Sequence, residues 1–188
     1  MKRKLLAAAL VISCLSLAVG GTLAYFTAED TAVNVITAGN IRIELKETAV
    51  PEGGGDPVPF DDVIGVMPGG EASKIVEVKN TGDKSAYIRI QVQKNLELAE
   101  GKTGEADLGL IGLNIDKESW TEKDGCYYYN EPLAAGDTTK PLFTAVSFSK
   151  EMGDLYQNSK AIISVKAGAV QADNNGNSAP EAAGWPEE

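Results

Sequence analysis

The sequence predicts an all-β protein, an antiparallel β-sandwich of jelly-roll type with one or two short helices. Apolar and polar residues alternate with period two along most of the chain, which is typical of half-buried antiparallel strands. Clusters of turn-forming residues separate these runs, at intervals that suit a sandwich of about eight strands. No segment is long enough for the helical crossovers of a parallel α/β fold. The alternating runs lie at 41–46, 76–79, 88–93, 111–115 and 163–169.

The strongest local turn is Asp124-Gly125, between residues 119–123 and 126–129. Asp-Gly tolerates the positive φ angles of a type I′ turn, so these two runs are expected to form a β-hairpin. Alternation sends Tyr127 and Tyr129 to one face and Tyr128 to the other. We interpret the aromatic cluster as cross-strand packing in preference to a sugar-stacking platform.

Two other turn clusters are Met67-Pro68-Gly69-Gly70 and Asn80-Thr81-Gly82-Asp83. Short helices are expected only at Leu96–Glu100 and Lys150–Tyr156. A flexible loop is expected at 51–57, where glycine and proline dominate.

The first 24 residues have the pattern of a signal peptide. A basic start, Lys2 to Lys4, precedes an apolar run that ends at Val19. Thr22 and Ala24 place small side chains at positions −3 and −1, so cleavage is expected between Ala24 and Tyr25. The alternatives are a retained membrane anchor and a lipidated Cys14, because Val11–Cys14 resembles a relaxed lipobox.

The remaining chain is predicted to comprise a β-sandwich domain over 25–172 and a disordered acidic tail over 173–188. The whole chain carries a formal net charge of −10. Loss of three basic residues with the signal would bring the charge to −13, which disfavours binding to nucleic acid or anionic lipid. The membrane is therefore expected to be a partner only through the uncleaved signal.

Cys126 would be the single cysteine left after loss of Cys14, so no disulfide within the domain is expected. Its tyrosine neighbours on a predicted strand favour a packed thiol over a reactive one.

The chain contains no histidine, which excludes serine and cysteine triads and an HExxH zinc site. No P-loop, nucleophile elbow or dinucleotide-binding glycine motif is present. A glycosidase pair of carboxylates stays open on composition, with Asp61-Asp62 and Asp116…Glu118 as the nearest pairs. The run that begins at Asp173 fails as an EF-hand loop because its twelfth position is Gly184. We predict no enzyme activity, cofactor or metal.

Residues 21–32 and 34–43 resemble the signal-peptide junction and mature N-terminus of the TasA/camelysin family of exported proteins. That junction combines a small-residue cleavage site, an aromatic pair, a Thr/Asn-rich stretch and a Gly-Asn-hydrophobic run. The body is similar to clostridial members of this group at 67–70, 76–82, 86–90, 120–128, 138–143, 152–158 and 169–172. The resemblance implies a jelly-roll subunit of extracellular fibres that is processed by a specialised, SipW-type signal peptidase.

The function expected from these observations is a secreted structural subunit of cell-surface or biofilm-matrix fibres. Residues 25–40 form the expected donor strand, which would pair with a sheet edge of the next subunit. Its candidate contact residues are Tyr25, Phe26, Val33, Val35 and Ile36. Alternatively, this segment folds back on its own sheet. The rival functions are a camelysin-type metalloendopeptidase, disfavoured by the absence of histidine, and a monomeric surface adhesin.

Overall fold

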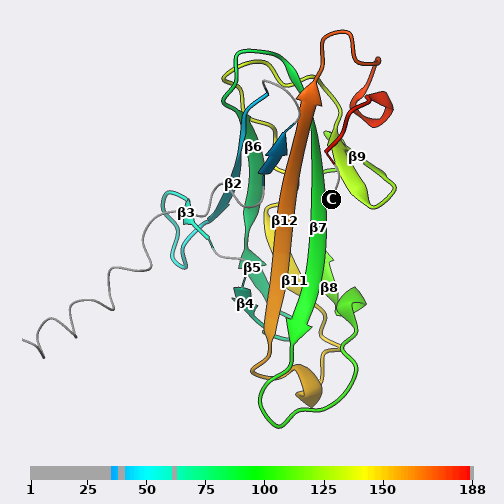
Figure 1. Cartoon of the computed structure of the whole chain (residues 1–188). Helices are drawn as coiled ribbons and strands as arrows, with labels where there is room; N and C mark the ends of the chain where they lie inside the picture. The colour runs from blue at the N-terminus through cyan, green and yellow to red at the C-terminus, as the bar shows by residue number, and fades with distance from the viewer. Residues whose placement is uncertain (1–34, 38–40, 61–62, 187–188) are drawn as a thin grey trace, which may run out of the picture. The chain divides into compact units, whose positions relative to one another are not determined.

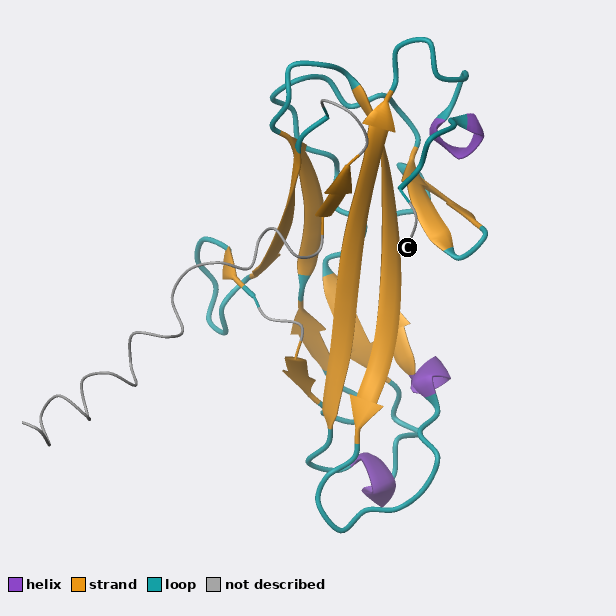
Figure 2. Ribbon diagram, in the orientation of Figure 1, coloured by secondary structure: helices purple, strands orange, loops and turns teal. Residues whose placement is uncertain are grey.

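The computed structural model describes residues 35–37, 41–60 and 63–186, which belong to one compact unit of the chain, Thr31–Glu188. Within these residues, strands form two layers that enclose a common core (Figures 1 and 2). The predicted all-β sandwich is confirmed. The predicted signal peptide, its cleavage site at Ala24 and Tyr25, and Cys14 lie outside the described residues.

The first layer is built on two long antiparallel strands that run side by side in Figure 1, β7 (Ala86–Glu97) and β12 (Lys160–Gln171). They pair in register over twelve residues, from Ala86 opposite Gln171 to Glu97 opposite Lys160. The layer has the order β1-β12-β7-β10-β9, and β4 also pairs with β12. The shorter strands are β1 (Val35–Thr37), β4 (Val63–Gly65), β9 (Trp120–Lys123) and β10 (Cys126–Tyr129).

The second layer combines two three-stranded sheets, β3-β2-β6 and β5-β11-β8. Their strands are β2 (Ile43–Ala49), β3 (Val58–Pro59), β5 (Glu71–Ser73), β6 (Ile75–Asn80), β8 (Ile111–Leu113) and β11 (Ala145–Phe148). Backbone hydrogen bonds join the two sheets, because Leu142 N donates to Val76 O (2.8 Å) and Val76 N donates to Phe143 O (3.1 Å). The segment before β11 therefore continues the ladder alongside β6.

The core lies between the layers and follows the period-two pattern. On β7 and β12 the alternate residues Ile88, Ile90, Ile163 and Val165 are fully buried. Val76, Val78, Val146 and Phe148 of the second layer belong to the same cluster. Each such side chain contributes about 1.5–3 kcal/mol by leaving water, which is why alternation predicts the strands so well.

The predicted helix at Leu96–Glu100 is wrong. Leu96 and Glu97 extend β7, because Ala161 and Lys160 of β12 continue the ladder opposite them. Within Lys150–Tyr156, a short 3₁₀ helix, η2, forms at Asp154–Tyr156. Two further single-turn 3₁₀ helices are η1 (Leu108–Leu110) and η3 (Ala179–Glu181).

The predicted hairpin at Asp124-Gly125 is confirmed. Asp124 has φ 51° and Gly125 has φ 77°, so both turn residues are left-handed as a type I′ turn requires. The hairpin also separates the tyrosines as expected: Tyr127 and Tyr129 pack against the main core, whereas Cys126 and Tyr128 join a second cluster on the other face. Cys126 is buried, in agreement with a packed thiol.

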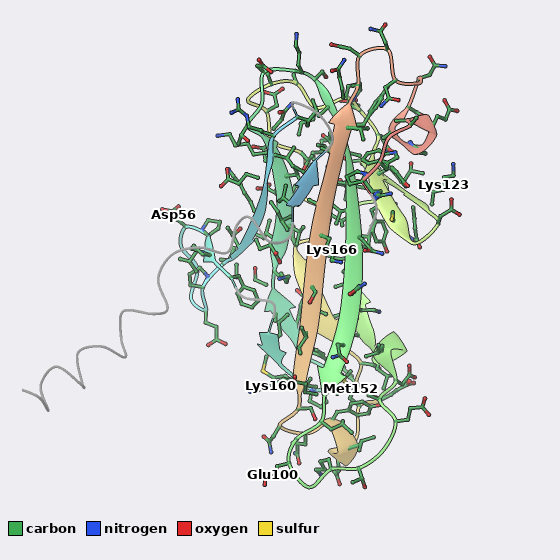
Figure 3. All side chains as sticks on the ribbon, in the orientation of Figure 1. Asp56, Glu100, Lys123, Met152, Lys160 and Lys166 are labelled. Atoms are coloured by element: carbon green, nitrogen blue, oxygen red, sulfur yellow. The ribbon has the colours of Figure 1, made fainter. Side chains whose placement is uncertain are left out.

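The tail differs from the disorder expected of it, since residues 173–186 fold over that second cluster. Ala179 is fully buried there, and the Trp185 ring lies 5.5 Å from the Tyr128 ring and 5.1 Å from the Arg89 guanidinium. Lys123, labelled in Figure 3, donates from Nζ to the Pro180 carbonyl (3.1 Å). Burial of a few apolar side chains offsets the polar composition, so this segment, which we call the C-terminal strap, is ordered as far as Pro186.

Candidate strand-acceptor groove

A groove runs between the edge of β8 in the second layer and the β7-β10-β9 side of the first layer. It consists of two adjoining cavities of about 650 and 300 Å³, and Leu113, Ile115 and Tyr127 line both. The larger cavity also contacts Asn114, Lys117, Trp120, Thr121 and Glu122, and the smaller one Val92, Lys94, Ile111 and Gly112. We call the two cavities together the β8 groove. The wall that the two cavities share is apolar and aromatic, and polar side chains such as Lys94, Lys117 and Glu122 complete the lining.

The outer edge of β8 faces this groove with the backbone of Leu113 and, just beyond the strand, of Ile115. On its other side β8 pairs with β11, with Leu113 opposite Val146. Asn114 N donates to Ala145 O (3.5 Å) and Asp116 N donates to Leu142 O (2.8 Å), so the even-numbered residues bond toward β11 and its upstream segment. By alternation, the amides of Leu113 and Ile115 point away from β11. Within 35–37, 41–60 and 63–186, no strand pairs with that outer edge.

Two side chains hold the β8 segment in place. Lys94 of β7 donates from Nζ to the carbonyl oxygens of Ile111 (2.8 Å) and Leu108 (3.1 Å), and so fixes the start of β8. Asn114 fixes its end, because its Oδ1 accepts from Thr144 N (2.9 Å) and Ala145 N (2.8 Å). These hydrogen bonds hold the edge in one conformation, so a strand that paired with it would bind with a lower entropic cost.

Aromatic residues of the hairpin form the opposite wall. Trp120 is buried, donates from Nε1 to Lys140 O (3.2 Å) and packs at 5.0 Å against the Tyr129 ring. Partial burial of the Tyr127 hydroxyl, together with the nearby Glu122 carboxylate, raises the pKa of Tyr127 above its usual value. Tyr127 therefore keeps its proton to higher pH than a free tyrosine, and its hydroxyl can donate a hydrogen bond.

The chain enters β9 through a tight turn at Asp116. Its Oδ1 accepts from the backbone amides of Glu118 (3.0 Å) and Ser119 (3.3 Å). A side-chain hydrogen bond from Ser119 has the largest effect, and these bonds hold the pKa of Asp116 below its usual value of 3.8. Asp116 and Glu118 are thus brought together by a turn, in which Asp116 caps backbone donors.

The predicted donor segment is described only at its end. Val35 and Ile36 lie in β1, which pairs parallel with β12 of the same chain, Val35 opposite Ala167 and Ile36 opposite Gly168. The fold-back alternative thus holds for Val35–Thr37. Tyr25, Phe26 and Val33 lie outside the described residues, as does the carboxylate pair Asp61-Asp62.

No pattern in the sequence points to the groove. Leu113 and Ile115 appear in the sequence only as core positions of an alternating run, although the structure leaves both half-exposed at a sheet edge. One feature of the sequence could have indicated an edge strand: the alternating run at 111–115 is short and is followed directly by the polar residues 116–119. Among the described residues, no three His, Cys, Asp or Glu side chains cluster as a metal site, and no helix is long and apolar enough to cross a membrane.

Comparison with family models, curated proteins and solved structures finds no match to this chain.

Proposed function

We propose that this protein is a secreted structural subunit of cell-surface or biofilm-matrix fibres, and that each subunit donates its N-terminal segment to the β8 groove of the next. The observation that carries the proposal is the outer edge of β8, which pairs with no strand of the described residues and borders a groove with Leu113, Ile115 and Tyr127 in its wall. An open edge of this kind invites strand addition unless something covers it. Main-chain hydrogen bonds would supply affinity. Contacts between the groove walls and every second side chain of the donated strand would supply specificity.

The donor would be the stretch from Tyr25 to Asn34, which we call the N-terminal arm. It contains no proline, and five of its ten residues, Tyr25, Phe26, Thr27, Thr31 and Val33, are of types that favour strands. At 3.3 Å per residue, its ten residues span about 33 Å when extended. The arm directly precedes β1, whose pairing with β12 anchors its base on the donating subunit.

Donor and acceptor are different surfaces of the chain, so the contact is heterologous. Such contacts generate open filaments when the rotation between successive subunits does not close into a ring. The resemblance of residues 21–43 to the TasA/camelysin junction supports the same reading. In this proposal a specialised signal peptidase cuts after Ala24 and frees the arm outside the cell, where the subunit then associates with its own copies.

The proposal is tested by comparing the chain that begins at Tyr25 with a chain that begins at Ala32, from which residues 25–31 are missing. Negative-stain electron microscopy should show filaments for the first and none for the second. Circular dichroism should show the same β content and thermal midpoint in both, because the arm precedes every described strand. Filaments from the Ala32 chain would contradict the proposal. So would a Tyr25 chain that stays monomeric at raised concentration, as an adhesin would.

A further inference from the structure

Lys74 is the one charged residue that is buried among the described parts of the chain, with no exposed surface. It lies between β5 and β6, at the point where the chain passes from one sheet of the second layer to the other. Its Nζ contacts Oε2 of Glu47, which lies on β2 with 14% of its side chain exposed. Burial of a lysine ammonium group carries a desolvation penalty of several kcal/mol, which a paired carboxylate only partly offsets. The proposed assembly contact does not involve Lys74.

The surroundings hold the amine in one place. The backbone amide of Lys74 donates to Thr144 O (3.1 Å), and the Phe60 ring lies 5.6 Å from Nζ. Glu47 is fixed by the ladder between β2 and β6, where it stands opposite Val76. Nucleophile and carboxyl group are therefore held together by strands on both sides, with an apolar ring over the amine.

From this geometry we propose that Lys74 and Glu47 condense into an intramolecular amide, a covalent cross-link between β2 and the β5–β6 junction. A proton passes from the Lys74 ammonium to the Glu47 carboxylate, and the neutral amine attacks Cδ. The Nζ–Cδ bond forms, one Cδ–O bond breaks, and the departing hydroxyl takes a second proton from Nζ and leaves as water. No oxidant, reductant or cofactor is needed, because an ammonium group and a carboxylate together contain all the atoms and the charge of an amide and one water molecule.

Two physical effects favour this condensation over the ion pair. Holding both groups in contact makes the reaction unimolecular, with effective concentrations that reach about 10⁵–10⁸ M in well-oriented cases. The reaction also removes two charges from a poorly solvated site, where an ion pair bears a desolvation penalty that a neutral amide largely avoids. The partly exposed Glu47 side chain gives the released water a path to solvent.

The cross-link would pin the two sheets of the second layer where their strands meet. No disulfide could do this, because Cys126 is the single cysteine among the described residues and lies on β10 of the other layer. The inference does not depend on the fibre proposal, although a subunit under tension would benefit from such a bond.

Intact-mass spectrometry of the full purified chain, denatured and reduced, tests the bond directly. The measured mass should be lower than the sequence mass by one water. Trypsin should fail to cleave after Lys74, leaving residues 47–79 in one peptide. Digestion after glutamate should release a branched pair, 45–52 joined to 72–77, with no cleavage at Glu47.

Variants identify the two partners. Lys74→Arg and Glu47→Ala should each restore the full sequence mass and abolish the branched pair. Because either variant could also fail to fold, Glu47→Gln serves as a second arm: attack on its amide releases ammonia and gives the same branched peptide as the wild type. The proposal is overturned by an unmodified wild-type mass. It is equally overturned by a water loss that persists in Lys74→Arg, or by a branched peptide joining 72–77 to a segment other than 45–52.

Discussion

The ammonium group of Lys94 lies 2.8 Å from the carbonyl oxygen of Ile111, so a side chain of β7 holds the first residue of β8 in the opposite layer. The same ammonium group also donates a hydrogen bond to the carbonyl oxygen of Leu108, at 3.1 Å. This bridge sets the width of the β8 groove at its inner end, because Lys94 and Ile111 both line the smaller cavity.

Replacing Lys94 with methionine should therefore loosen the groove. The variant keeps an apolar stem but leaves two carbonyls without their donor, and we expect a loss of about 1–2 kcal/mol in the free energy of unfolding. Urea denaturation measures this loss. Lys102→Met, at an exposed loop position, is the matched control and should change stability little. If Lys94→Met and Lys102→Met change the free energy of unfolding by the same amount, the hydrogen bonds of Lys94 do not stabilise the fold.

Asp116 should give the protein part of its acid sensitivity. Its pKa in the folded state lies below 3.8, so its turn hydrogen bonds contribute stability that is present above that pH and is lost as the pH falls through the lower folded value. Asp116→Asn should be less stable than the wild type at about pH 6, and the difference should shrink below about pH 4.

Thermal midpoints across this pH range provide the measurement for Asp116. Glu118→Gln removes a charge from the same turn and is the control, since only the Glu118 backbone amide takes part in the turn. A pH-independent difference between Asp116→Asn and the wild type would rule out this role for the carboxylate.

The C-terminal strap should protect Cys126. Cys126, Tyr128, Val170 and Ala179 form one buried cluster against which Trp185 packs. Trp185→Ala should cost about 1–2 kcal/mol, less than a fully buried tryptophan, because the ring is only partly buried. Opening of the strap would then become about tenfold more frequent, and the labelling rate of the Cys126 thiol should rise by a similar factor.

The labelling rate can be followed with a thiol-specific chromogenic reagent under native conditions. Asn177→Ala changes an exposed residue of the same strap and should leave the rate unchanged. If Trp185→Ala and Asn177→Ala label alike, the strap does not gate access to the thiol.

Much of the fold could be predicted from the sequence because its strands are amphipathic. The alternation around Ile88 and Ile163 and the Asp124-Gly125 turn each report a local requirement, burial of one face or a left-handed backbone. The strap could not be predicted in this way, because its order depends on Trp185 meeting Tyr128, a contact between distant parts of the chain. Residues 173–186 read alone are polar and turn-rich.

The groove could not be predicted either, because it too depends on how distant parts of the chain are arranged. Leu113 and Ile115 alternate like any core strand, and only the sheet order reveals that β8 is an edge strand. The parallel pairing of β1 with β12 was equally hidden, since three residues carry no signal for the partner that they meet.

Strand donation into the β8 groove predicts that two variants, each unable to polymerise alone, will bind one another when they are mixed. One chain begins at Ala32 and keeps the groove; the other begins at Tyr25 and carries Leu113→Glu and Ile115→Glu, which place charges in the groove. Light scattering after size-exclusion chromatography should find each variant monomeric alone. An equimolar mixture should form a one-to-one heterodimer that grows no further, because its single arm fills its single open groove. A mixture that stays monomeric, while the unmodified chain from Tyr25 forms filaments, would contradict strand donation into this groove.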